Sequence, residues 1–321
     1  MSGSLDAPIL TMTQEPIQGG LIPLAKHQVS ISSDAVRWES LSAPGRQVGT
    51  VAFCDLLGCS VAGTETASPK LVLHCFPKGK AGCFCGGASK TRTRRDHELP
   101  CSFAEQAISA CAAIRQALGQ GTSPRRFLVL VNPYGGGGKA AGVWRKLEPL
   151  LALAHIEAEL ITTTHQGHGR EVAAAVELGK YSALVTVSGD GLLNEVLNGL
   201  MSRADSADAL AQLPIAPAPG GTGNGLHQSI CFRAGEANDA VGTAFVLAKG
   251  RPAPLDLWEY MRPASADGEV PSEHIMWSFL SFAWGNSEFG RRRAAAVPRV
   301  LSATLLLVSE LCVAPAAPRP F

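Results

Sequence analysis

The sequence predicts an α/β protein whose largest unit is a mainly parallel β-sheet with helices on both faces, preceded by a small β-rich region. From residue 125 onward, short continuous apolar runs alternate with segments of helical periodicity. Glycine-rich turns follow three of these runs, where a buried strand would pass into a helix. In such a sheet the loops after the strands gather at one edge, and ligands bind there.

Composition limits the classes of protein that the chain can represent. Its 321 residues suit about two domains, and 46% hydrophobic residues are enough for a core. Charges nearly balance, with 28 Lys and Arg against 27 Asp and Glu, so we expect no nucleic-acid partner. The first thirty residues lack the pattern of a signal peptide, and the nine cysteines are scattered, which favours a reduced, cytoplasmic protein. No apolar run reaches the roughly 18 residues of a membrane span.

The N-terminal region, residues 1–123, is expected to be a separate accessory unit. We predict a loose tail over residues 1–33 and short strands between residues 35 and 73. Ser102-Phe-Ala-Glu105 has the form of a capping box and predicts a helix that ends at Gly119. The segment 119–124 then has the composition of a linker.

Six Lys and Arg residues and no acid occur between Lys78 and Arg95. Two interpretations remain open: a solvated loop, or a patch that meets anionic lipid headgroups. Cys83 and Cys85 lie in the same stretch, but a C-x-C without a second pair is only a weak indication of zinc.

The main sheet is predicted from a strand–helix alternation. Strands are expected at 127–131, 159–163, 183–187 and 215–217, and helices at 139–153, 170–178 and 192–201. The order indicates parallel strands, so the loops after them are where a ligand site is expected.

The first of these loops is Asn132-Pro-Tyr-Gly-Gly-Gly-Gly-Lys139. Its glycines allow the backbone to approach a phosphate, and the next helix points its N-terminus at the same place. It is not a Walker A loop, because Ala140 replaces the magnesium-binding hydroxyl. A merely flexible turn remains an alternative, as does a weak G-x-G-x-x-A dinucleotide motif. An oxidoreductase of that kind would leave Gly189-Asp190-Gly191 unexplained.

Two further glycine loops follow later strands. In Ser188-Gly-Asp190-Gly, the carboxylate could accept a proton from an attacking hydroxyl or hold magnesium, although Asp190 could equally be a helix N-cap. In the third loop, 219–225, Thr222 and Asn224 are candidates to bind phosphate oxygens. Three such loops at successive strand ends, with an acid in the middle one, predict a nucleoside triphosphate site.

Residues 130–139, 188–201 and 219–224 resemble the three successive motifs of lipid kinases of the diacylglycerol kinase type. Within that family the chain is most similar to the sphingosine kinases, through Asn198-Gly-Leu-Met201 and the stretch 278–285. The resemblance implies transfer of the γ-phosphate of ATP, with Mg²⁺, to the primary hydroxyl of a sphingoid base, sphingosine giving sphingosine 1-phosphate. It implies Asp190 as the catalytic base, with Ser188, Gly189, Asp190 and Gly191 touching the lipid. The positions implied to bind ATP are Asn132, Pro133, Tyr134, Thr163, Thr164, His165, Gln166, Gly167, Glu195, Gly221, Thr222 and Gly223.

The resemblance also implies a domain plan. We expect a nucleotide-binding lobe at 124–253, the start of an incomplete second β-rich lobe at 254–285, and a divergent tail at 286–321. Residues before Pro124 are similar to a pleckstrin-homology-like extension. Because the likeness stops after Gly285, we expect a truncated chain with weak or absent activity.

Several alternatives stay open at this point. The acceptor could be diacylglycerol or ceramide, the Gly-Asp-Gly motif could serve as in NAD kinases, or the chain could be a non-catalytic nucleotide- or membrane-binding fragment. We expect a cytoplasmic protein in peripheral contact with intracellular or plasma membranes. The sequence does not predict an oligomeric state or a metal ligand set.

Overall fold

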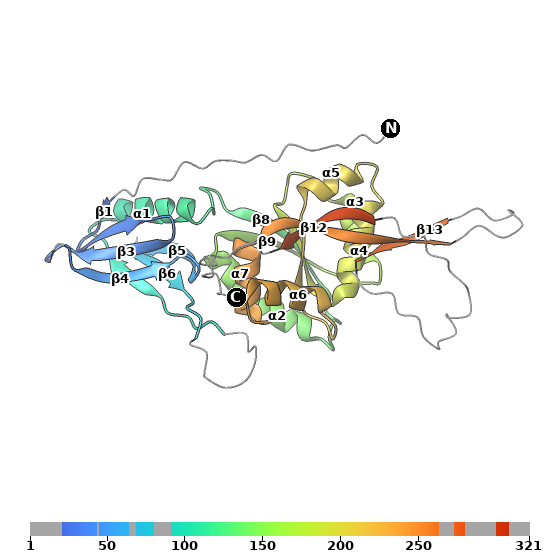
Figure 1. Cartoon of the computed structure of the whole chain (residues 1–321), viewed down its shortest axis with the longest axis horizontal. Helices are drawn as coiled ribbons and strands as arrows, with labels where there is room; N and C mark the ends of the chain where they lie inside the picture. The colour runs from blue at the N-terminus through green and yellow to red at the C-terminus, as the bar shows by residue number, and fades with distance from the viewer. Residues whose placement is uncertain are drawn as a thin grey trace, which may run out of the picture.

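The computed structural model describes residues 21–43, 45–63, 69–79, 91–262, 273–279 and 300–307. They form a β-rich accessory module, residues 21–117, and an α/β lobe, residues 125–307, which lie end to end (Figure 1). No helix in these ranges is long and apolar enough to cross a membrane. The C-x-C pair Cys83 and Cys85 lies outside the described residues.

The accessory module contains two antiparallel sheets. The four-stranded sheet is formed by β1 (Leu21–Pro23), β2 (His27–Ile31), β3 (Ala35–Ser40) and β4 (Gln47–Ala52). The three-stranded sheet is formed by β5 (Leu56–Ala62), β6 (Lys70–Cys75) and β7 (His97–Pro100). The prediction of a small β unit is confirmed, but the loose tail expected over residues 1–33 is wrong for 21–31, where β1 and β2 pair.

Helix α1 (Ala104–Ala117) packs on both sheets through Ala107, Ala110, Cys111 and Ile114, which share one helical face. The helix ends before Gly119, whose φ of 70° suits glycine, as expected. The predicted capping box is wrong. Phe103 is the N-cap without a side-chain cap, and the Ser102 amide donates to Gln106 Oε1 (2.9 Å).

The α/β lobe is built on one seven-stranded sheet with the order β13-β12-β14-β11-β10-β8-β9. Its strands are β8 (Arg125–Val131), β9 (Ile156–Thr162), β10 (Ala183–Ser188), β11 (Ile215–Pro219), β12 (Arg251–Arg262), β13 (Glu273–Ser278) and β14 (Val300–Leu307). Strands β8 to β11 are parallel, and β14 continues parallel to β11. Strands β12 and β13 run antiparallel at the edge.

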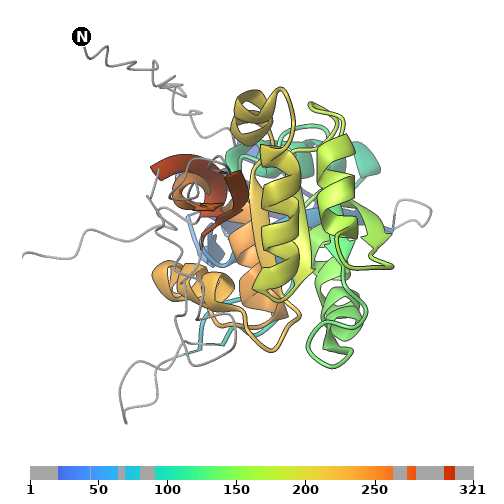
Figure 2. The ribbon, with the colours of Figure 1, turned by 90° about the vertical axis from the view of Figure 1, so that its right-hand side faces the viewer.

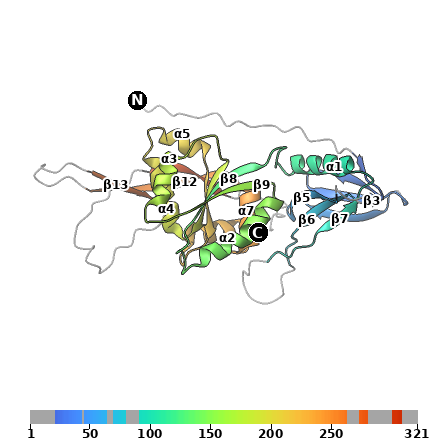
Figure 3. The same cartoon turned by 180° about the vertical axis from the view of Figure 1, so that it is seen from behind.

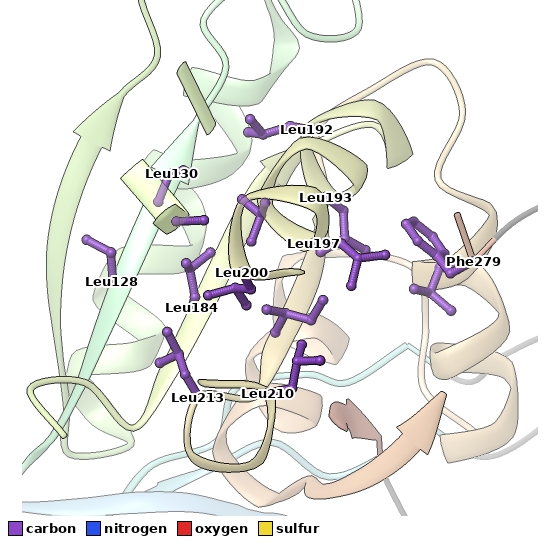
Figure 4. Packing of buried hydrophobic residues seen from close by; sticks show 14 of the residues in the cluster. Leu128, Leu130, Leu184, Leu192, Leu193, Leu197, Leu200, Leu210, Leu213 and Phe279 are labelled. Carbon is purple, nitrogen blue, oxygen red and sulfur yellow. The ribbon is translucent and has the colours of Figure 1, made fainter. Parts of the chain in front are cut away.

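Six helices cover the sheet: α2 (Lys139–Leu153), α3 (His168–Ala175), α4 (Asp190–Met201), α5 (Ser206–Gln212), α6 (Gly225–Ala234) and α7 (Ala240–Lys249). Alternation along β8 shows both faces buried. Leu128 and Leu130 pack toward α3, α4 and α5, whereas Phe127, Val129 and Val131 pack toward α2 and α7. Figure 2 shows α3 and α4 side by side in front of the sheet. Figure 4 shows Leu200 of α4 beside Leu184 of β10, with Leu193 and Leu197 toward Phe279.

The predicted strand–helix alternation is confirmed within a few residues, and the 139–153 helix matches α2. Two differences concern the second half of the chain. Helices α5, α6 and α7 were not predicted. Residues 254–285 and the expected divergent tail contribute β12, β13 and β14 to the main sheet. Non-local pairing explains the second difference, because β14 inserts between β11 and β12 although it follows both in sequence.

The accessory module meets the α/β lobe on the face covered by α2 and α7 (Figure 3). Leu57 and Phe76 of the module are buried in the same core cluster as Trp144 and Phe245. Gln120 Nε2 donates to the Leu57 carbonyl, and Lys249 Nζ donates to the Phe53 carbonyl (2.6 Å). Apolar burial and hydrogen bonds from side chains to backbone carbonyls therefore contribute to holding the two units together.

Candidate active site

The loop after β8 forms a tight glycine turn. Asn132 Oδ1 accepts from the Tyr134 amide (3.0 Å), and the Asn132 carbonyl accepts from the Gly135 amide. Three successive glycines, 136 to 138, have φ between 58° and 86°, a region that side-chain-bearing residues rarely occupy. Within the described residues the amides of Gly136 and Gly137 donate no hydrogen bond. They are therefore available to an anion at the start of α2.

The three glycine loops touch one another. A Cβ on Gly221 would come within 2.3 Å of Gly189 Cα, and one on Gly136 within 2.7 Å of the Gly220 carbonyl oxygen. These glycines are required because backbone approaches backbone with no room for a side chain. The three loops therefore meet at the carboxyl edge of the sheet, as predicted.

Asp190 lies at the first position of α4, after Gly189 as N-cap. Its carboxylate caps a different helix. Oδ2 accepts from the Gly225 amide (2.8 Å) and Oδ1 from the Leu226 amide (3.4 Å), both in the first turn of α6. The alternative that Asp190 caps its own helix is thus wrong. Two amides fix the carboxylate, while further lone pairs remain available to a ligand.

Helix α6 is held against α7 by a buried histidine. The Thr243 hydroxyl donates to the Asp239 carbonyl (2.6 Å), so its oxygen accepts from His227 Nε2 at 3.0 Å. Burial lowers the pKa of His227 to about 4, even though Asn238, Asp190 and Asp239 favour the protonated ring. His227 is therefore neutral near pH 7 and supports the helix whose amides hold Asp190.

The segment after β9 lies beside the second loop. Thr163 is buried and bonded to the Val131 carbonyl, which ties the end of β9 to β8. Glu195 of α4 accepts from the Gly169 amide at the start of α3 (3.2 Å). His165 contacts Glu171 (3.1 Å) and stacks on His168. The structure brings these predicted ATP positions to the same edge of the sheet as Asp190.

Other predicted site residues differ in how free their side chains are. Tyr134 is 81% exposed, Gln166 and Thr222 are exposed, and Ser188 is buried with its hydroxyl toward Gly135. Asn224, a candidate phosphate ligand, instead braces its own loop: Oδ1 accepts from the Gly221 amide and Nδ2 donates to the Gly221 carbonyl. The Nδ2 group keeps a second N–H donor, so the assignment of Asn224 to phosphate binding stays a prediction.

Asn198 has a structural role that its motif did not reveal. Its Nδ2 donates to the Trp277 carbonyl (2.9 Å), and its Oδ1 accepts from the Trp277 amide (2.8 Å). The side chain thereby pairs with β13 as a neighbouring strand would. This part of the Asn-Gly-Leu-Met motif anchors the edge strand to α4.

Two residues of the basic stretch 78–95, Arg92 and Lys78, contact an acid of the α/β lobe. Arg92 is 8% exposed, and its Nε and Nη2 donate to the two carboxylate oxygens of Glu236, at 2.8 Å each. Lys78 Nζ lies 3.0 Å from the same carboxylate. The lipid-headgroup interpretation is therefore wrong for Arg92, whose buried guanidinium neutralises an acid of the α/β lobe. For the rest of the stretch it stays a prediction, and Lys80 and Lys90 lie outside the described residues.

The donor set fits a phosphate chain better than a ready-made metal centre. The described residues hold no group of three or more His, Cys, Asp or Glu in reach of one ion. Mg²⁺ is commonly bound by one or two carboxylates with phosphate oxygens and water completing its shell. Asp190, whose carboxylate lies by Gly223 of the third glycine loop, could hold such an ion together with phosphate oxygens and water.

Comparison with known proteins shows what the part of the chain that carries the site is similar to. The family model described as diacylglycerol kinase catalytic domain matches residues 126–260. This range contains the three glycine loops, Asp190 and helices α2 to α7. A crystal structure of a diacylglycerol kinase from Bacillus anthracis str. Sterne covers 47% of this chain and 44% of its own. It is 23% identical, with a TM-score of 0.36.

Several curated relatives are named for a narrower class, the sphingosine kinases. Sphingosine kinase 2 of Arabidopsis thaliana is 32% identical over 232 residues, 72% of this chain and 45% of that protein. Sphingosine kinase 1 of Homo sapiens is 39% identical over 168 residues, 50% of this chain and 41% of its own. Human sphingosine kinase 2 is 32% identical over 263 residues, which are 74% of this chain and 38% of that protein. The resemblance to sphingosine kinase-type lipid kinases is confirmed, and the chain spans less than half the length of these relatives.

Proposed function

We propose that the protein is an ATP-dependent lipid kinase that phosphorylates the primary hydroxyl of a sphingoid base. The observation that supports this most directly is Asp190, fixed by the α6 amides where three glycine loops meet. The curated relatives are named sphingosine kinases, which favours sphingosine over diacylglycerol or ceramide as acceptor.

In this proposal the glycine loops position the nucleotide. The amides of Gly136 and Gly137 and the N-terminus of α2 bind phosphate oxygens, and Gly221 to Gly223 border the same space. The residues 163–167, together with Glu195, line the nucleotide from the β9 side. ATP supplies the transferred phosphoryl group. Phosphoryl transfer depends largely on positioning and charge stabilisation, and backbone N–H donors around the phosphates supply both.

Asp190 is proposed to accept the proton of the lipid hydroxyl as that oxygen attacks the γ-phosphorus of ATP, whose bond to the β–γ bridging oxygen breaks to release ADP. Its two bonds to α6 amides set the carboxylate in one orientation, with Ser188, Gly189 and Gly191 bordering the acceptor. Proton acceptance by a positioned carboxylate contributes about 10²- to 10⁴-fold in such reactions. Mg²⁺, where present, would be held by phosphate oxygens and water with Asp190 as the nearest protein carboxylate.

The domain plan is proposed in the same terms. Residues 1–123 form the accessory region, and its described sheets of four and three strands closed by α1 support a pleckstrin-homology-like unit. Residues 124–253 form the nucleotide lobe, 254–285 the start of a second β-rich lobe and 286–321 a divergent tail; the described strands β12, β13 and β14 join the sheet of the nucleotide lobe. We also propose a cytoplasmic protein that contacts membranes peripherally to reach its lipid.

The deciding experiment is a lipid phosphorylation assay with purified 1–321, ATP and Mg²⁺. Sphingosine, ceramide and diacylglycerol compete in one reaction, and Asp190→Asn is the control because the amide keeps the shape but is no base. Sphingosine 1-phosphate from the parent, lowered about 10²-fold or more in the control, supports the proposal. Equal product from parent and control, or preference for another acceptor, contradicts it.

A further inference from the structure

Helix α6 has an acidic side chain at each end. At its N-terminus, Asp190 accepts from Gly225 and Leu226. Its C-terminus is closed by Gly235, with φ of 63°, and followed by Glu236, whose side chain is fully buried. The ten residues of α6 span about 15 Å, so a single helix connects the surroundings of the two carboxylates.

The C-terminal end of α6 is held by the accessory module. Arg92 forms the bidentate pair with Glu236, donates to the Phe76 carbonyl (2.7 Å) and to Asp55 (3.0 Å), and stacks 3.8 Å from the Phe245 ring centroid. Lys78 donates to the Gly235 carbonyl (2.7 Å), the last carbonyl of the helix cap. Both basic residues therefore reach from the module to the end of one helix.

This contact is more specific than the apolar part of the interface. A bidentate guanidinium–carboxylate pair is satisfied in one geometry, whereas apolar surfaces tolerate small slides. Replacing a buried ion pair by apolar residues is often neutral for stability, so its presence points to a requirement for one defined arrangement. That arrangement determines where α6 ends and hence where its first amides lie.

We propose that Arg92 is a positioning residue for phosphoryl transfer, through which the accessory module sets the orientation of Asp190. Arg92 and Lys78 fix the C-terminus of α6, His227 fixes its middle against α7, and the Gly225 and Leu226 amides fix the carboxylate. The module is on this view a part of the catalytic unit. The inference rests on the proposed role of Asp190.

The test uses the full chain with Arg92→Lys, which keeps the charge but not the bidentate geometry. Arg94→Lys is the matched control, because Arg94 lies two residues away and pairs with Asp96 while 53% exposed. Lys78→Met is a gentler second variant, since it leaves the Arg92–Glu236 pair in place. Two quantities are measured: amide hydrogen exchange by NMR, and kcat and KM for ATP.

We expect Arg92→Lys to increase the amide exchange rate at Gly225 and Leu226 relative to the α4 amides. Lys78→Met should increase it by a smaller factor. We expect kcat to fall about ten- to a hundredfold with KM for ATP nearly unchanged, because a shift of the base by about 1 Å is that costly. Exchange and kcat equal to those of Arg94→Lys would overturn the inference. So would faster exchange spread evenly over the whole α/β lobe.

The two proposals fail in different ways. If the parent and Asp190→Asn make equal product, the kinase proposal is wrong and the exchange rates alone decide whether Arg92 controls the α6 N-terminus. If the parent is active and depends on Asp190, but Arg92→Lys matches the control in both quantities, only the positioning role is wrong.

Discussion

The two ends of α6 place acids in contrasting surroundings. Glu236 is fully buried, and three cationic nitrogens from Arg92 and Lys78 satisfy its carboxylate. Asp190 is only partly buried and receives backbone amides alone. A buried carboxylate whose two oxygens are both held by fixed cations is closed to a substrate and serves structure. A carboxylate held by two amides is oriented but still able to accept a proton, which is what chemistry at the glycine loops requires.

The largest expected effect on stability is at the Glu236 end. Arg92→Ala would leave a buried carboxylate with Lys78 as its one cation, and losing one partner of a buried pair costs about 3–5 kcal/mol. Urea unfolding of the full chain measures it. Arg94→Ala removes an exposed pair and is expected to cost less than about 1 kcal/mol. Similar midpoints for the two variants would mean that burial of the Arg92 pair has been misjudged.

At the Asp190 end the next effect comes from backbone crowding. Gly221→Ala places a methyl group 2.3 Å from Gly189 Cα, and overpacking of this kind costs about 1–3 kcal/mol. Gly191→Ala is the matched control, because nothing lies within 4 Å of its Cβ. In the first turn of α4 that change is expected to be neutral or slightly stabilising. Thermal unfolding of both variants checks this, and an equal loss in both would contradict the close contact of the loops.

The elements that position Asp190 were only partly predictable. Parallel strands buried on both faces give continuous apolar runs, so β8 and β10 and the loops after them follow from local sequence. Helix α6 begins at Gly225 and has little amphipathic pattern, so it was not predicted. Without α6, the amide partners of Asp190 could not be known, although the acid itself was predicted correctly as part of the glycine-loop cluster.

Long-range pairs explain the remainder. Arg92 and Glu236 are 144 residues apart, and no spacing rule connects a basic loop to an acid beyond a helix end. A run of basic residues without acids has the same composition whether it meets solvent, lipid or a buried carboxylate. Strand β14 was placed in a tail for a related reason, since its neighbours in the sheet are determined by tertiary pairing.

The middle of α6 gives a pH-dependent test of the same helix. His227 is buried and neutral, with its pKa lowered to about 4, and Cys231, Asp190 and Asp239 are the other titratable groups near it. The unfolded chain binds the proton near pH 6.5, so stability present above that pH is lost as pH falls toward 4. Between pH 7.5 and 5 the loss from this group is about 2 kcal/mol. Urea unfolding at both values, compared with His227→Gln, isolates the contribution; an equal pH slope in the variant would assign the loss to other groups.

The smallest effect belongs to an ion pair that resembles Lys78–Glu236 in composition but not in burial. Lys70 and Glu98 pair across β6 and β7 at 2.8 Å, with side chains 41% and 58% exposed. Water solvates both charges, so Glu98→Gln is expected to cost less than about 1 kcal/mol. The cost should also shrink when urea unfolding is repeated at high salt. Arg92→Ala should keep most of its cost under the same salt, because the Arg92 and Glu236 side chains are only 2% and 0% exposed. A large, salt-resistant loss at Glu98 would remove the distinction between the two kinds of pair, and with it the argument that burial makes the α6 contact special.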